Sequence, residues 1–166
     1  MRTDKIYLVG FMGAGKSTVA EALGTRLEWQ VADIDELIET RERRAIADIF
    51  SQDGEAYFRR VEQAVLQELL PQRHTIVATG GGTFVDPASR MAINSDGASI
   101  WLNLSFEQVI ERLPHDGRRP LAADRTAMLA LYEARRTAYA LAHLRLDTRR
   151  TPVGELVERI LEWLGD

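Results

Sequence analysis

Short apolar runs alternate with longer amphipathic stretches along the whole chain. The apolar runs have the length of strands and lie at Ile6–Val9, around Val31, at Thr75–Ala78, at Ile100–Leu104 and around Leu146. Between them, hydrophobic residues recur at spacings of three and four, which is typical of helices packed on a sheet. Strands that alternate with helices predict βαβ units and a parallel sheet.

Two of the amphipathic stretches have clearly defined apolar faces. Ser17–Leu27 and Glu55–Leu70 each predict a helix, with Val19, Leu23 and Leu27 on the face of the first and Phe58, Val61, Val65 and Leu69 on that of the second. Both helices are expected to pack on the sheet.

Local signals mark the starts of two further helices. Ser105 and Gln108 form a capping box directly after a predicted strand, with Leu104 and Val109 placed as a hydrophobic staple. Near the end, Thr151-Pro152 offers a cap and a first-turn proline. The helix predicted after it has an apolar stripe formed by Val153, Leu156, Ile160, Leu161 and Leu164.

The first predicted strand runs into a glycine-rich loop of the form G-x-x-x-x-G-K-S at residues 10–17. In a P-loop the glycines let backbone N–H groups surround phosphate oxygens, a lysine reaches the outer phosphates, and a Ser hydroxyl ligates Mg²⁺. Here these residues are Lys16 and Ser17. The chain has 21 Lys and Arg residues, of which only Lys5 and Lys16 are lysines. Chance is therefore a poor explanation of this loop.

Composition narrows the class of protein. A length of 166 residues suits a single domain over 1–166. A net charge of −4 argues against general nucleic-acid binding, and no segment has the roughly 20 apolar residues of a membrane span. The start does not resemble a signal peptide, and zero Cys fits a reducing cytoplasm. We expect a cytoplasmic monomer.

Two carboxylates follow the second predicted strand. Asp33 and Asp35 lie where open α/β sheets bind ligands. In extended chain they would point to opposite sides, one toward Mg²⁺ and the other toward an acceptor hydroxyl. Alternatively, either one caps the following helix, for which Asp35 is well placed. The P-loop favours a functional interpretation.

Other candidates lie further along. Three glycines, Gly80 to Gly82, follow the strand Thr75–Ala78, either as a flexible turn or as a backbone that a ligand approaches closely. Arg59 and Glu62 lie three apart on one helix. They form either a surface ion pair or a carboxylate-binding Arg held by Glu62; Arg135 has the same two interpretations.

Residues 114–125 break the helical pattern with three Arg, two Pro and one Gly. Such a charged, turn-rich segment between helices is compatible with a solvated loop. Downstream of a P-loop it also predicts a mobile lid over a phosphoryl-transfer site.

Taken in order, these motifs resemble the shikimate kinase family over nearly the whole chain. The resemblance rests on Gly10–Thr18, Asp33-x-Asp35 with Ile38-Glu39, Ile46-x-x-Ile49-Phe50, Gly54-Glu55-x-x-Phe58-Arg59-x-x-Glu62, Gly80–Gly82, Arg119-Pro120-Leu121, Arg135 with Tyr139, and Asp147-Thr148.

The resemblance implies a single three-layer α/β/α domain of the P-loop kinase type, with a five-stranded parallel sheet and a mobile lid. It implies Mg²⁺-dependent transfer of the ATP γ-phosphoryl group to the 3-hydroxyl of shikimate. The products would be shikimate 3-phosphate and ADP, within aromatic amino acid biosynthesis.

Residue roles carried over from the family divide into donor and acceptor sides. On the donor side, the resemblance implies ATP binding by Gly13, Ala14, Gly15, Lys16, Ser17, Thr18, Arg119 and Arg150, with Ser17 on Mg²⁺ directly and Asp33 through water. On the acceptor side it implies shikimate binding by Asp35, Arg59, Gly80, Gly81, Gly82 and Arg135. Asp35 would be the base, and Lys16, Arg119 and Asp33 would also serve catalysis.

The chain departs from the family pattern at Arg43, at Ala122, in Arg136-Thr137-Ala138, and near Arg149 and Arg150. Two alternatives stay open. One is a kinase of another small carboxylate-bearing polyol such as gluconate; the other is a catalytically silent nucleotide-binding module. The second would be expected to lose Asp35, Arg59 or Arg135, all of which are present.

Overall fold

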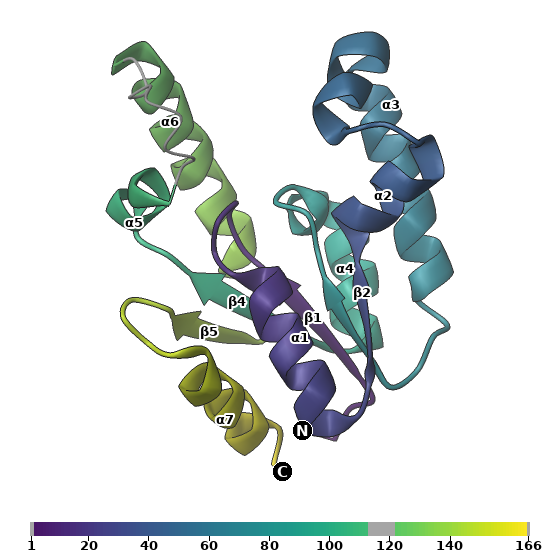
Figure 1. The fold of residues 1–166 in the computed structure, drawn as a ribbon, viewed down its shortest axis with the longest axis vertical. Helices are drawn as coiled ribbons and strands as arrows, with labels where there is room; N and C mark the ends of the chain where they lie inside the picture. Colours follow the sequence, from purple (N-terminus) through teal and green to yellow (C-terminus); the bar gives the residue numbers. More distant parts are fainter. Residues whose placement is uncertain (1, 113–121, 166) are drawn as a thin grey trace.

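The computed structural model describes residues 2–112 and 122–165, and in this part of the chain five parallel strands form one sheet (Figure 1). The strands are β1 (Lys5–Val9), β2 (Gln30–Asp33), β3 (Thr75–Ala78), β4 (Ala98–Asn103) and β5 (Leu144–Asp147). Their order in the sheet is β2-β3-β1-β4-β5. The predicted parallel sheet is therefore confirmed.

Helices cover both faces of the sheet because neighbouring strand residues point to opposite sides. Ile6 and Leu8 pack in one apolar cluster with helices α1 (Lys16–Leu27) and α7 (Val153–Leu164). Tyr7 and Val9 belong to a second cluster on the other face. The helices of that face are α2 (Ile34–Glu42), α3 (Ile46–Leu69), α4 (Pro87–Asp96), α5 (Phe106–Glu111) and α6 (Ala122–Tyr139). The three-layer α/β/α architecture is confirmed.

Helix starts were predicted with mixed success. The capping box at Ser105 is present, with Ser105 and Gln108 bonded reciprocally at the start of α5. Pro152, rather than Thr151, is the N-cap of α7, because the Thr151 hydroxyl bonds backward to the Arg149 carbonyl. The first-turn position predicted for Pro152 was wrong by one residue.

Two helical segments differ from the sequence pattern. Helix α3 begins at Ile46 rather than Glu55, and its first part is set off by Gly54, whose φ of 82° no helix adopts. The predicted lid, 114–125, falls largely outside the described residues, but its last four residues form the first turn of α6. That end of the predicted loop was wrong. The helix α4 was not predicted at all.

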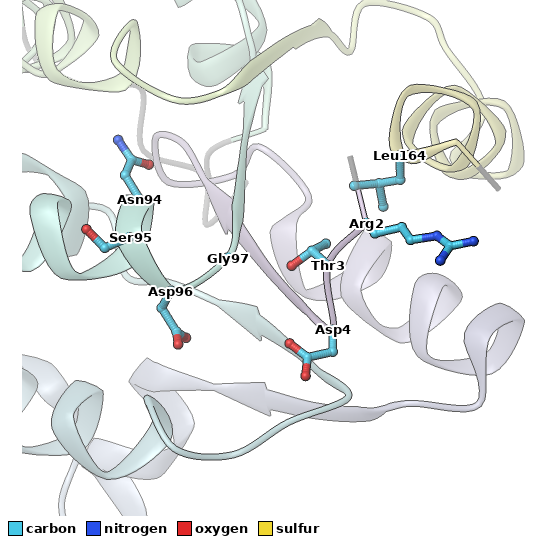
Figure 2. Close-up of a pocket in the computed structure, with 8 residues that line it drawn as sticks. All are labelled: Arg2, Thr3, Asp4, Asn94, Ser95, Asp96, Gly97 and Leu164. Carbon is cyan, nitrogen blue, oxygen red and sulfur yellow. The ribbon is translucent and has the colours of Figure 1, made fainter.

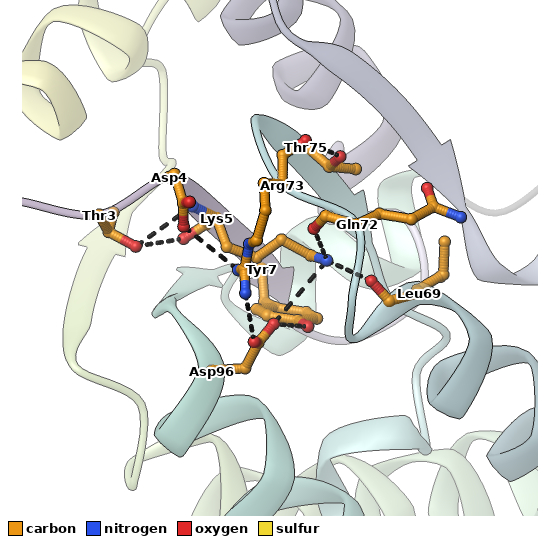
Figure 3. Close-up of polar contacts among 9 residues, drawn as sticks. All are labelled: Thr3, Asp4, Lys5, Tyr7, Leu69, Gln72, Arg73, Thr75 and Asp96. Atoms are coloured by element: carbon orange, nitrogen blue, oxygen red, sulfur yellow. Dashed lines mark hydrogen bonds and ion pairs between the residues drawn. The ribbon is translucent and has the colours of Figure 1, made fainter.

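A polar network surrounds Lys5 at the amino ends of the strands, which we call the amino edge of the sheet (Figure 3). Lys5 is the first residue of β1 and is fully buried. Its ammonium donates to the carbonyls of Leu69 and Gln72 and lies 3.8 Å from Asp96. Tyr7 donates to Asp96 at 2.6 Å, and Arg73 pairs with the same carboxylate at 2.9 Å.

A hollow of about 540 Å³ lies at the same edge, bounded by the chain start, the end of α4 and Leu164 of α7 (Figure 2). Asp4 and Asp96 line it, and both belong to the network around Lys5. Arg2–Asp4 and Gly97, which line it, directly precede β1 and β4. The predicted chemistry belongs to the opposite edge, where the strands end.

Candidate active site

The glycine-rich loop joins β1 to α1 in the arrangement that the sequence predicts. Gly13 and Gly15 have φ of 77° and 89°, a left-handed conformation that glycine adopts without steric cost. Gly15 is the N-cap of α1, and since it has no side chain, it cannot cap the helix's first N–H groups. The uncapped N-terminus of α1 therefore has the form of an anion site.

Lys16 begins α1 and turns back over this loop. Its ammonium donates to the Gly10 carbonyl at 2.6 Å. Burial lowers the pKa of Lys16 to about 8, although the nearby Asp35 carboxylate acts in the opposite direction. Lys16 therefore combines a positive charge with a partly desolvated setting, which strengthens its attraction for phosphate oxygens.

Asp33, the last residue of β2, contacts the first turn of α1. Its carboxylate accepts a hydrogen bond from the Ser17 hydroxyl at 2.6 Å and also caps α2 by accepting from the Glu36 backbone N–H. The capping position that seemed suited to Asp35 thus belongs to Asp33. Ser17 and Asp33 place two hard oxygen atoms side by side, a donor set of the kind that Mg²⁺ prefers.

Asp35 lies in the first turn of α2, so the prediction that Asp33 and Asp35 alternate along extended chain was wrong. Burial raises the pKa of the Asp35 carboxyl, and the charge of Lys16 opposes this rise. Asp35 and Lys16 thus lie close enough for the charge of each to affect the pKa of the other.

The three glycines after β3 each lie against a different charged side chain. A Cβ on Gly80 would lie 2.7 Å from an Asp35 carboxylate oxygen, and one on Gly81 would lie 2.8 Å from the Arg135 guanidinium. A Cβ on Gly82 would lie 2.5 Å from two nitrogens of Arg59. At these separations the charged group would have to shift to admit a Cβ. The turn therefore lets Asp35, Arg135 and Arg59 approach its backbone closely, which favours the close-approach interpretation of the three glycines.

Arg59 and Glu62 form an ion pair at 2.9 Å along α3. Glu62 is only 3% exposed, so the surface-pair alternative was wrong. The second Glu62 oxygen accepts from the Thr83 hydroxyl at 3.0 Å. Glu62 thereby fixes the guanidinium of Arg59 beside Gly82.

Arg135 reaches the same turn from α6. Its guanidinium lies 5.7 Å from the ring centre of Phe11, a loop residue, and Tyr139 of the same helix donates to the Gly81 carbonyl. Burial raises the pKa of Tyr139 to about 12, so the phenol stays protonated as this donor. The site thus combines cations from α3 and α6 with a carboxylate from α2.

One contact to the loop escaped sequence reasoning. Arg112, at the end of α5, donates to the Gly13 carbonyl at 2.7 Å. The sequence carries no specific signal for this contact, because Arg112 ends a helix outside any recognised motif. The predicted Arg119 lies outside the described residues. Arg150 is exposed in the loop between β5 and α7, with a left-handed φ of 55°, and its predicted adenine contact is untested.

Comparison with known proteins agrees with this geometry. The family model described as "Shikimate kinase" matches residues 12–165. The chain belongs to the shikimate kinase family. A shikimate kinase of Sulfurihydrogenibium is 39% identical, with 94% of this chain and 95% of that protein covered.

Solved shikimate kinases share the fold over nearly the full length. The Aquifex aeolicus structure is 34% identical with a TM-score of 0.88, covering 97% of this chain and 96% of that one. The Acinetobacter baumannii shikimate kinase, solved in complex with shikimate, is 31% identical with a TM-score of 0.89, covering 98% and 93%. The predicted family and fold are therefore confirmed.

Proposed function

We propose that this shikimate kinase family member transfers the γ-phosphoryl group of ATP to the 3-hydroxyl of shikimate. The observation that carries the proposal is the glycine turn, where Asp35, Arg135 and Arg59 surround residues 80–82 beside the phosphate loop. A hydroxylated carboxylic acid matches these groups. Its carboxylate suits the two arginines, and its hydroxyl suits the aspartate.

On the donor side, the loop backbone from Gly13 to Thr18 would hold the ATP phosphates, with Lys16 at the γ-phosphate. Mg²⁺ would be held by Ser17 directly and by Asp33 through water, where it would neutralise charge on the phosphates. We extend the donor site to Arg119 of the lid and to Arg150 near the adenine on the family resemblance alone. Lys16 and Arg119 would stabilise charge on the transferred group.

On the acceptor side, Arg59 and Arg135 would clamp the carboxylate, and the Gly81 backbone would contact the ring. Asp35 would orient the 3-hydroxyl and take its proton. A bond then forms between that oxygen and the γ-phosphorus while the bond to ADP breaks. The work of the protein is mainly positioning and charge stabilisation, as is general for phosphoryl transfer.

A coupled ADP-release assay with shikimate, quinate, gluconate and nucleoside monophosphates tests the acceptor. Turnover that depends on shikimate is expected. Turnover on gluconate in its place would favour the rival polyol kinase. No ADP release with any acceptor, together with ATP binding, would favour a silent nucleotide-binding module.

Arg59→Ala tests the carboxylate clamp. Removal of a charge-assisted hydrogen bond should raise the KM for shikimate about tenfold or more and leave the KM for ATP within about twofold. Equal weakening of both substrates would argue against the clamp.

We further propose a cytoplasmic monomer that takes shikimate and ATP and no nucleic acid. The absence of cysteine from the sequence supports a reducing cytoplasm, and the net charge of −4 argues against nucleic-acid binding. Among residues 2–112 and 122–165, no helix is long and apolar enough to cross a membrane.

A further inference from the structure

Thr83 connects the glycine turn to Glu62, the partner of Arg59. It is the first residue of a short 3-10 turn, η1 (Thr83–Val85), directly after the glycines, and it is 1% exposed. Its hydroxyl accepts from the Gly80 backbone N–H at 3.0 Å and donates to Glu62 at 3.0 Å.

The direction of these two bonds follows from their partners. A backbone N–H can only donate, and an ionised carboxylate can only accept. The Thr83 hydroxyl therefore has one arrangement, with its lone pair toward Gly80 and its proton toward Glu62. A rotating hydroxyl would leave one of two buried groups without a partner.

Glu62 divides its two oxygens between Thr83 and Arg59. Oε2 accepts from Thr83, and Oε1 accepts from the Arg59 guanidinium at 2.9 Å. Two bonds from different directions fix the plane of the Glu62 carboxylate, which in turn holds one terminal nitrogen of Arg59. The Arg59 Nε lies 3.6 Å from the more exposed carboxylate of Glu55. In the described part of the chain, no buried side-chain polar atom lacks a hydrogen-bond partner.

We propose that Thr83 is a positioning residue for acceptor binding, holding Glu62 so that Arg59 presents its guanidinium to the substrate carboxylate. This rests on the proposed shikimate kinase function. In this role Thr83 acts on substrate binding indirectly, through its hydrogen bond to Glu62 and the bond between Glu62 and Arg59.

Thr83→Val tests the inference, because valine keeps the shape and removes the hydroxyl. We expect the KM for shikimate to rise about tenfold, kcat to change by less than about threefold, and the KM for ATP to stay unchanged. Thr83→Ser restores the hydroxyl and should bring the KM for shikimate back to within about twofold. If Thr83→Val does not fold, Thr83→Ala gives the same comparison against Thr83→Ser.

Thr79→Val is the matched control. Thr79 is buried on the same turn, and its hydroxyl donates to the Leu8 carbonyl at 2.8 Å. Its loss should lower the thermal midpoint without moving the KM for shikimate. An equal rise in KM in both valine variants would show general loosening of the turn and overturn the positioning role.

Coupling with Glu62 is the second readout. In a Glu62→Gln background, Thr83→Val should add less than it does alone, since both changes act on one interaction. Additive effects would contradict the inference. Arg59→Ala separates the two proposals. If it leaves the KM for shikimate unchanged, the clamp itself fails. If it raises the KM while Thr83→Val does not, only the Thr83 inference fails.

Discussion

At the scale of single residues, the site combines a cation, Lys16, with a carboxylate, Asp35, both partly shielded from water. Burial lowers the pKa of Lys16 and raises that of Asp35, and each opposes the shift of the other. Each charge therefore favours the ionised form of the other group.

Asp35→Asn should lower kcat at least about a hundredfold, because the amide cannot take the hydroxyl proton. ATP binding, followed by calorimetry, should stay within about threefold, since the phosphate loop is unchanged. In the parent enzyme kcat should fall on the acid side as Asp35 becomes protonated. A variant with near-parental kcat would remove Asp35 from the role of base.

ATP binding should weaken above pH 8, where Lys16 loses its proton in the free protein. Bound phosphates favour the ammonium, so binding in this range takes up a proton. The dissociation constant for MgATP should rise about tenfold or more between roughly pH 7.5 and 9.5. Calorimetry in buffers of different ionisation enthalpy measures both quantities. Lys16→Met is the control, with weak and pH-independent binding; a flat profile in the parent would contradict the assignment.

At the scale of elements, helices from both sides of the β3 turn converge on three residues that lack side chains. Helix α2 supplies Asp35, α3 supplies Arg59 and α6 supplies Arg135. The backbone of this turn is therefore surrounded by side chains from three different helices.

Gly82→Ala should displace the Arg59 guanidinium, because the added Cβ would lie 2.5 Å from its two terminal nitrogens. We expect the KM for shikimate to rise about tenfold with little change in the KM for ATP. Gly154→Ala in α7 is the control, since a Cβ there meets nothing within 4 Å. Steady-state kinetics of both variants decides, and unchanged kinetics for Gly82→Ala would show that Arg59 has room to move.

Sequence patterns predicted these elements best where the signal was local. The periodic apolar face gave α1, and the capping box gave the start of α5. Helix α4 carries only Ser89 and Ile93 buried, too few for a visible stripe. The pairing of Gly80–Gly82 with three distant side chains could not be predicted, because it depends on how three helices pack around the turn.

At the scale of the whole molecule, the candidate active site and the buried polar network around Lys5 lie at opposite ends of the strands. The phosphate loop and the glycine turn follow the carboxyl ends of β1 and β3, whereas the network around Lys5 lies at the amino edge (Figure 3). This separation predicts that stability and activity can be changed independently.

Asp96→Asn should lower the free energy of unfolding by about 3 kcal/mol, because it removes the nearest counter-charge of the buried Lys5. The kcat and both KM values should stay within about twofold. Glu155→Gln breaks an exposed helical pair with Arg159 and should cost less than about 0.5 kcal/mol. Urea unfolding measures both variants. Loss of activity without loss of stability in Asp96→Asn would show that the two edges are coupled.

The glycine turn also bears on how this gene can drift over evolutionary time. Each of the three glycines lies against a side chain from a different helix, so a side chain added at any one of them must displace one particular charged group. A duplicated copy released from selection for its acceptor would be expected to accumulate side chains at residues 80–82 early.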